Sequence, residues 1–143
     1  MSLKKMLKLH EGVRSHVYLC SLGYETIAVG RNISMDGGLG LSEDEIDFLL
    51  DNDIRRVTAE LSKEFEWFDD LDEVRKNAMI DISFNLGATK LRGFKKALQA
   101  MSEQNWLEAS KEFSDSRWYN QVGIRAKRLC SMIQTGEYTN EFI

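Results

Sequence analysis

The apolar positions of the chain follow a helical period from its first residues. Leu3, Met6 and Leu7 recur at three- and four-residue spacing, which predicts a short helix with one apolar face. Gly12 follows this pattern closely, and a glycine just beyond the last periodic residue is a typical helix stop signal. The first helix is therefore expected to end at Glu11.

A different pattern follows, in which a glycine-containing turn joins two strand-like runs. The runs His16–Cys20 and Glu25–Gly30 are short and include β-branched and aromatic residues, as strands do. Between them, Gly23 can adopt the positive φ angle that tight hairpin turns require. These features predict a β-hairpin. Residues 31–40 are too rich in glycine for a helix and are expected to form a third short strand and a loop.

Helical periodicity returns after this loop. Ser42 and Glu45 have the spacing of a capping box, with three acids in the first turn, where the helix dipole favours them. Apolar residues then keep one face for about twenty residues, which predicts a long helix. Further helices are expected from Asp70 or Asp72 to Gly87, and over 91–101, 105–113 and 124–134.

The order of these elements predicts a mostly helical α+β protein. A small β lobe at about 13–41 is joined by a linking helix at about 42–62 to a helical lobe at about 63–143, which also takes the N-terminal helix 2–11. A chain of 143 residues should bury about two thirds of its unfolded surface. A single domain, 1–143, is therefore expected to fold without help from metals.

The net charge of -4 is unevenly distributed along the chain. Residues 42–73 hold thirteen acids and three bases, whereas residues 74–143 hold eleven bases and seven acids. This asymmetry fits a basic face for an anionic polymer. Charge alone does not separate the carboxylates of peptidoglycan from the phosphates of nucleic acid as the ligand of such a face. The alternative is that these charges belong to an ordinary solvated surface with no ligand.

The cysteines and the N-terminal residues indicate the compartment. Cys20 and Cys130 lie far apart in unlike contexts, which favours free thiols in a reducing environment over a disulfide. The start of the chain is interrupted by lysines and lacks the apolar core of a signal peptide. No stretch approaches the roughly 20 apolar residues of a membrane span. His10 and His16 have no further ligand at useful spacing, so neither a metal nor a cofactor is expected.

Three side chains with reactive groups gather between the first helix and the hairpin. Glu11 is at a helix end, Cys20 ends the first strand and Thr26 is near the start of the second. A carboxylate that faces a second reactive group and a hydroxyl is suited to splitting a glycosidic bond, since one group protonates the leaving oxygen while another orients water. The pattern therefore favours glycoside hydrolysis.

The spacing of these residues resembles that of a known enzyme family. Eight residues separate Glu11 from Cys20 and five separate Cys20 from Thr26, and the runs Thr26–Gly30, Ser116–Gln121 and Arg125–Arg128 also match. In these features the chain resembles the phage lysozyme (endolysin) family, glycoside hydrolase family 24, of the T-even phage type. The resemblance implies a lysozyme-like fold and hydrolysis of the β-1,4 bond between N-acetylmuramic acid and N-acetylglucosamine in peptidoglycan. In the usual triad of Glu, Asp and Thr, Cys20 stands in place of Asp.

The resemblance also implies a role for each site residue. Glu11 would be the general acid, while Cys20 and Thr26 would place the attacking water on the far face of the sugar, with inversion. Arg125 would be the electrostatic partner of the catalytic acid until substrate displaces it. The residues implied to bind substrate are Gly30, Asn32, Phe84, Asn85 and Arg117.

Cys20 admits more than one interpretation. The pKa of a free thiol is about 8.5, and the carboxylate of a neighbouring Glu11 would raise it. Cys20 is therefore expected to orient or weakly activate water without forming a covalent sugar intermediate. The alternative is that Cys20 is a small buried hydrophobic side chain.

The predicted linking helix has one polar residue on its apolar face. This residue is Asp53, and the resemblance implies an ion pair with Arg31, just after the second strand. The alternative is that both side chains are solvated.

The resemblance implies partners as well as chemistry. They are bacterial peptidoglycan and a holin, which would release the enzyme from the host cytoplasm at lysis; neither nucleic acid nor a membrane is expected, and the protein should be a monomer. Two alternatives remain open. A lytic transglycosylase also needs a Glu but leaves an anhydro sugar. A catalytically inactive peptidoglycan-binding domain, in which Cys20 marks decay, would bind the wall without clearing cells.

Overall fold

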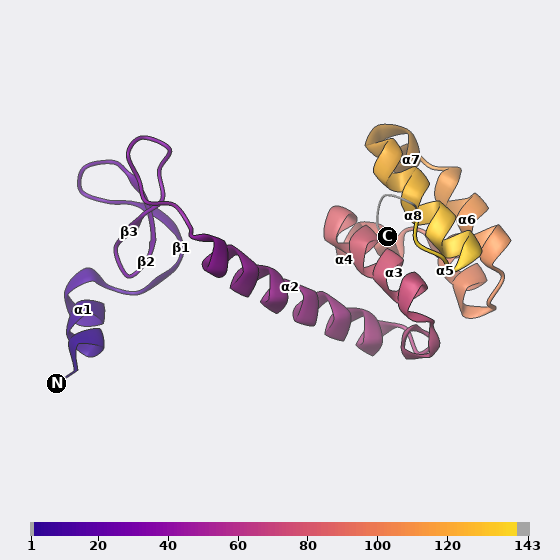
Figure 1. Cartoon of the computed structure of the whole chain (residues 1–143), viewed down its shortest axis with the longest axis horizontal. Coiled ribbons are helices and arrows are strands. Elements are labelled where there is room, and N and C mark those ends of the chain that lie inside the picture. The colour runs from indigo at the N-terminus through magenta and orange to yellow at the C-terminus, as the bar shows by residue number, and fades with distance from the viewer. Residues whose placement is uncertain (1, 140–143) are drawn as a thin grey trace. The chain divides into compact units, whose positions relative to one another are not determined.

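A computed structural model describes residues 2–139, and its contacts divide the chain into two compact units. The N-terminal unit is Met1–Asp51 and the C-terminal unit is Asn52–Ile143, so the boundary falls within helix α2 (Glu43–Glu64) (Figure 1). The predicted single domain, with the first helix in the helical lobe, concerns the relation between the units and stays a prediction.

The N-terminal unit begins with helix α1 (Leu3–Glu11), as the apolar period predicts. The side chain of Ser2 caps it by accepting a hydrogen bond from the backbone N–H of Lys5. At the other end, Gly12 has φ 80° and donates its backbone N–H to the carbonyl of Lys8. Glycine adopts this angle without steric cost, which explains why the helix ends here.

Three antiparallel strands in the order β1-β2-β3 form the sheet of the N-terminal unit. The central strand, β2, carries Thr26, which pairs with Tyr18 on one side and with Asn32 on the other. The hairpin and the third short strand are therefore confirmed. The strands are β1 (Arg14–Leu19), β2 (Glu25–Ala28) and β3 (Arg31–Asn32). Cys20 lies one residue beyond the end of β1.

Helix α2 begins as the capping box predicts. The backbone N–H of Ser42 donates to Glu45 Oε1 at 2.9 Å, and the backbone N–H of Glu45 donates to Ser42 Oγ at 3.4 Å. Two donors that would otherwise have no intrahelical partner are thereby bonded. The mostly helical α+β fold predicted from the sequence is confirmed.

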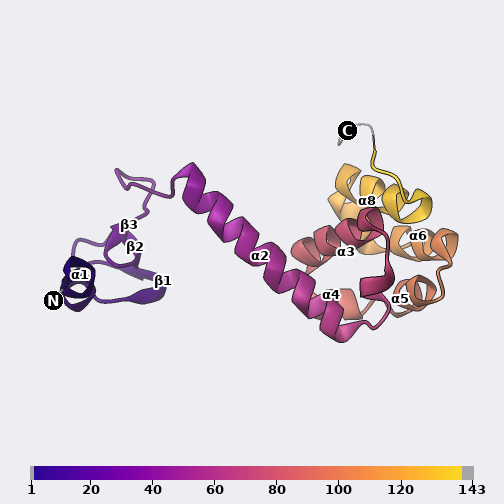
Figure 2. The same ribbon diagram turned by 60° about the horizontal axis from the view of Figure 1, so that its bottom comes forward.

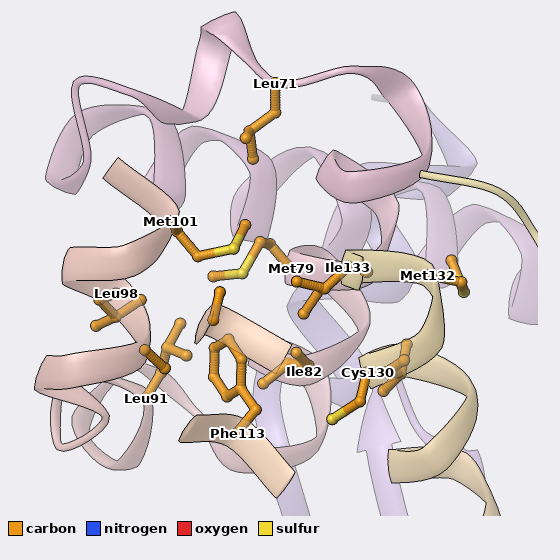
Figure 3. Packing of buried hydrophobic residues seen from close by; sticks show 14 of the residues in the cluster. Leu71, Met79, Ile82, Leu91, Leu98, Met101, Phe113, Cys130, Met132 and Ile133 are labelled. Atoms are coloured by element: carbon orange, nitrogen blue, oxygen red, sulfur yellow. The ribbon is translucent and has the colours of Figure 1, made fainter. Parts of the chain in front are cut away.

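The C-terminal unit is helical, and its helices enclose the hydrophobic core (Figures 2 and 3). Helix α8 packs against α3 and α6, and α5 packs against α6. Side chains from each of these helices meet in the core, where Met79, Ile82 and Phe113 are at most 1% exposed. The helices are α3 (Glu73–Leu86), α4 (Ala88–Arg92), α5 (Lys95–Ser102), α6 (Trp106–Ser114), α7 (Arg117–Val122) and α8 (Ile124–Thr135), with a short 3-10 turn at Phe68–Asp70.

The predicted helix over 91–101 is wrong in one respect, because it is two helices. Helix α4 ends before Gly93, and α5 begins only after Phe94, whose φ and ψ of -82° and 56° are not helical. The ring of Phe94 packs against Phe113 and Trp118, with ring centres 5.3 and 6.1 Å away. Aromatic packing thus accompanies the break. Helix α7, capped by Ser116, was not predicted.

Arg75 joins three helices of the C-terminal unit. Its guanidinium lies 4.1 Å from the centre of the Trp106 ring and donates to the carbonyls of Ile133 and Gln134. The last carbonyls of a helix have no intrahelical donor, so a cation placed there bonds them and complements the dipole. With a side chain only 12% exposed, Arg75 ties the end of α8 to α3 and α6.

The ion pair expected between Arg31 and Asp53 joins residues of different units and stays a prediction, but each residue has an ion-pair partner within its own unit. Arg31 Nη1 lies 2.5 Å from Glu45 Oε1, and Asp53 lies 3.4 Å from Arg56 on its own helix. The capping box explains the first pair, because it turns the Glu45 side chain back toward the loop that precedes α2. The sequence-based expectation overlooked this acid.

The described residues also bear on the expected thiols, membrane spans and metal ligands. Cys20 and Cys130 are free thiols, as expected, and burial raises the pKa of Cys130 to about 12. No helix within residues 2–139 is long and apolar enough to cross a membrane. The same residues contain no group of three or more His, Cys, Asp or Glu side chains that could hold a metal ion.

Candidate active site

The predicted site residues fall into two sets, one in each unit. The N-terminal unit holds the proposed triad and two of the residues predicted to bind substrate: Glu11, Cys20, Thr26, Gly30 and Asn32. The C-terminal unit holds Phe84, Asn85, Arg117 and Arg125.

Glu11 is the last residue of α1, and its carboxylate lies against the backbone of Gly30. A Cβ atom added at Gly30 would lie 2.5 Å from Glu11 Oε2 and 3.1 Å from its carboxyl carbon. Gly30 also has φ 71°, in the left-handed region that favours glycine. A side chain at position 30 would therefore collide with the Glu11 carboxylate in this position, and the absence of a side chain at Gly30 lets the carboxylate approach the backbone of the turn before β3.

Cys20 is half-buried in the turn that joins β1 to β2. Its backbone N–H donates to the carbonyl of Tyr24 at 3.0 Å, and its carbonyl accepts from the N–H of Gly23 at 2.8 Å. The pKa of the Cys20 thiol is lowered, chiefly by the backbone N–H of Tyr24 and then by that of Leu22. Loss of solvation opposes this effect without cancelling it. The expectation of a raised pKa is therefore wrong, because N–H groups of the turn stabilise the thiolate.

Thr26 is 3% exposed in the central strand, and its hydroxyl donates to the carbonyl of Tyr24 at 2.8 Å. The same carbonyl accepts from the backbone N–H of Cys20 at 3.0 Å. The Thr26 hydroxyl also contributes to lowering the pKa of the Cys20 thiol, although less than the backbone N–H groups of the turn. The turn at Tyr24 therefore connects the two residues.

Tyr24 is a residue that the sequence analysis missed. Its backbone N–H lowers the pKa of Cys20, and its carbonyl accepts from both Cys20 and Thr26. These contacts use the main chain, so the residue type at position 24 gave no signal. Gly23, as a marker of the turn, was the available hint.

Asn32 organises the loop that follows β3. Its side-chain Oδ1 accepts from the backbone N–H and the hydroxyl of Ser34, at 2.9 and 2.8 Å. Its backbone carbonyl accepts from the N–H of Leu39 at 2.8 Å. The predicted role of Asn32 in substrate binding stays a prediction.

In the C-terminal unit, Asn85 fixes the position of Trp118. Asn85 Oδ1 accepts from Trp118 Nε1 at 2.7 Å, and the neighbouring Arg117 is exposed at the start of α7. Phe84, beside Asn85 on α3, is 40% exposed. Substrate binding by these three predicted residues stays a prediction.

Arg125 has an acidic partner within the C-terminal unit. Its Nε donates to Asp81 Oδ1 at 2.7 Å, and its Nη2 lies 2.6 Å from the same oxygen. Asp81 was not identified from the sequence. The predicted partnership of Arg125 with Glu11 joins residues of different units and stays a prediction.

The spacing that brings Glu11 and Gly30, and Cys20 and Thr26, together is part of a longer match. The family model for phage lysozyme matches residues 8–133, which include every predicted site residue. The chain belongs to the phage lysozyme family. This membership suggests a peptidoglycan-hydrolysing muramidase, and the family is one of glycoside hydrolases.

Relatives of this phage lysozyme family member occur in a eukaryote and in a phage. It is 29% identical to probable T4-type lysozyme 1 and 30% identical to probable T4-type lysozyme 2, both of Dictyostelium discoideum, over 161 residues. Each alignment covers 94% of this chain and 95% of the relative. The chain is also 28% identical to the pre-baseplate central spike protein Gp5 of Enterobacteria phage T4, over 95% of this chain and 28% of that protein.

The contact between Gly30 and Glu11 predicts the effect of Gly30→Ala. The added Cβ should displace the Glu11 carboxylate, and the left-handed backbone angle should cost roughly 1 kcal/mol of stability. Amide chemical shifts of the ¹⁵N-labelled protein would report the displacement at Glu11, and urea unfolding would report the stability.

Gly23→Ala is the matched control, since Gly23 has φ 83° and no atom within 4 Å of an added Cβ. The Gly23→Ala variant should lose a similar amount of stability, while the chemical shift of the Glu11 amide stays unchanged. Equal shifts of the Glu11 amide in the two variants would show that Gly30 does not position the carboxylate.

Proposed function

We propose that this protein is an N-acetylmuramidase that hydrolyses the β-1,4 bond between N-acetylmuramic acid and N-acetylglucosamine in bacterial peptidoglycan. The observation that supports this proposal most directly is the arrangement of side chains in the N-terminal unit, in a chain that belongs to the phage lysozyme family. There, a carboxylate at a helix end lies against Gly30, and the Cys20 backbone N–H and the Thr26 hydroxyl both donate to the carbonyl of Tyr24 in the hairpin. This arrangement supplies an acid and a water-orienting pair.

Glu11 is the general acid of the proposed reaction. It donates its proton to the glycosidic oxygen as the bond to the sugar's anomeric carbon breaks, and the leaving sugar departs as a neutral alcohol. Arg125 is proposed as the electrostatic partner of this carboxyl, to be displaced when substrate binds.

Cys20 and Thr26 handle the attacking water. The Thr26 hydroxyl orients a water molecule, and the Cys20 thiolate accepts one of its protons as the water oxygen bonds to the anomeric carbon. The lowered pKa of Cys20 increases the thiolate fraction available for this step. The product has the inverted configuration, and one proton then returns from the thiol to Glu11 through solvent. The Cys20 sulfur forms no bond to the sugar.

The remaining predicted residues bind the glycan. The proposed release of the protein to the cell wall is the one that the resemblance to endolysins implies. Substrate binding is assigned to Gly30, Asn32, Phe84, Asn85 and Arg117. The protein acts as a monomer that stays in the cytoplasm of a bacterial host until a holin releases it to the cell wall. Lysis of the bacterium is then the consequence of wall hydrolysis.

Replacement of Glu11 by Gln tests the general acid. Gln keeps the size of the side chain but cannot donate a carboxyl proton, so activity should fall at least about 100-fold while the fold is unchanged. The measurement is the clearing of permeabilised bacterial cells, with circular dichroism as the check on folding. Glu73→Gln, which makes the same charge change in helix α3 of the C-terminal unit, at a residue with no proposed role in the reaction, should clear cells at the wild-type rate. Glu11→Gln activity within a few-fold of wild type would refute the assignment.

Replacements of Cys20 test the proposed base. Cys20→Ala should lose at least about tenfold in rate with the fold intact, because no group then accepts the water proton. Cys20→Asp should stay active, with its pH optimum shifted to lower pH, since a carboxyl has a pKa of about 3.9 and serves as base in more acidic solution. The measurement is the rate of wall clearing against pH. Full activity of Cys20→Ala, or a covalent sugar adduct on Cys20 found by mass spectrometry, would contradict the mechanism.

A further inference from the structure

Strand β3 consists of Arg31 and Asn32, yet it adjoins two of the proposed triad residues. Gly30, which precedes it, lies against the carboxylate of Glu11. Asn32, its second residue, pairs with Thr26 across the sheet. Arg31 stands between them. A contact that holds Arg31 therefore restrains the backbone between Gly30, which lies against Glu11, and Asn32, which pairs with Thr26.

The side chain of Arg31 is held from the start of helix α2. Arg31 Nη1 lies 2.5 Å from Glu45 Oε1 and also donates to the carbonyl of Gly40 at 3.2 Å. The same Glu45 oxygen accepts from the backbone N–H and the hydroxyl of Ser42, at 2.9 and 2.8 Å. Glu45 thus links β3 to the capped first turn of a long helix.

This ion pair persists over a wide pH range. The bond from Arg31 is the largest contribution that lowers the pKa of Glu45 from 4.5 to about 2, and the bonds from Ser42 add to it. Because the folded pKa is the lower one, the interaction is fully present above pH 4.5 and is lost only as the pH falls through about 2. The link is therefore intact wherever the enzyme would work.

The ion pair between Arg31 and Glu45 should add little to the stability of the fold. The two side chains are 32% and 35% exposed, and ion pairs near the surface add little to the free energy of unfolding. Its larger effect should be on the orientation of β3, because this strand has only two residues and pairs with β2 at just two positions. A small displacement of a catalytic group can cost far more in rate than in stability.

We propose that Glu45 is a positioning residue for the muramidase reaction, acting through Arg31 to hold β3 so that Gly30 keeps its contact with Glu11 and Asn32 its pairing with Thr26. The inference rests on the proposed function. The side chain of Glu45 bonds to Arg31 and Ser42, so it would act on the proposed triad through Arg31. By restraining β3, Glu45 helps to set the distance between Glu11 and the residues that orient water.

Replacement of Glu45 by Gln separates positioning from helix capping. A Gln at this position of a capping box can still accept from Ser42, so α2 keeps its cap while the charge opposite Arg31 is removed. Glu43→Gln is the matched control. It removes the same charge from the same helix turn, and Arg31 bonds to Glu45 instead.

The kinetic experiment compares kcat and KM on purified peptidoglycan, at a temperature well below the melting point of every variant. Glu45→Gln should lower kcat about tenfold with KM changed less than twofold, and Glu43→Gln should match wild type. Arg31→Gln should have the same effect as Glu45→Gln, and the double variant should be no worse than either single one, because both act through one contact. A Glu45→Gln kcat within twofold of wild type, or additive losses in the double variant, would overturn the proposal.

A second readout does not depend on catalysis. In ¹⁵N-labelled protein, Glu45→Gln should shift the amide signals of Gly30 and Glu11, and Glu43→Gln should leave them unchanged. Unchanged signals in Glu45→Gln would overturn the proposal whatever the kinetics. If wild-type protein cleaved no peptidoglycan while these amides shifted, the proposed function would fail and the placement of Gly30 by Glu45 would stand.

Discussion

The antiparallel pairing of the short strand β2 is the constraint on which the candidate active site depends. Thr26 in this strand pairs with β1 on one side and with β3 on the other. In the turn before β2, the backbone N–H of Cys20 and the hydroxyl of Thr26 both donate to the carbonyl of Tyr24, and the turn after β2 carries Gly30 against the carboxylate of Glu11. The surroundings of all three residues of the proposed triad are therefore formed by strand β2 and the turns on either side of it.

The same turns account for the electrostatics of the site. Backbone N–H groups of Tyr24 and Leu22 favour a negative charge on the Cys20 sulfur and lower the pKa of its thiol. The resemblance implies an Asp at this position in the usual triad. The lowered pKa of the thiol is the electrostatic feature that supports the proposed role of Cys20 as proton acceptor.

Much of the fold could be predicted from the sequence because local residues set the ends of its elements. Gly12 ends α1, and the Ser42 and Glu45 capping box starts α2, at the expected positions. The break at Phe94 depends on packing against aromatic rings distant in sequence, which periodicity does not report. The spacing of Glu11, Cys20 and Thr26 indicated the candidate site. The direction of the Cys20 pKa shift and the pairing of Arg31 with Glu45 depend on backbone and side-chain directions that become visible only in three dimensions.

The central claim is that water cleaves the glycan, with Glu11 as acid and Cys20 with Thr26 directing the water. Mass spectrometry of the fragments released from purified peptidoglycan tests it most directly. Hydrolysis in H₂¹⁸O should give fragments that end in reducing N-acetylmuramic acid and carry one ¹⁸O atom at the new end. Fragments that end in an anhydro sugar without the label would identify a lytic transglycosylase, and either that result or an uncleaved glycan would contradict the account.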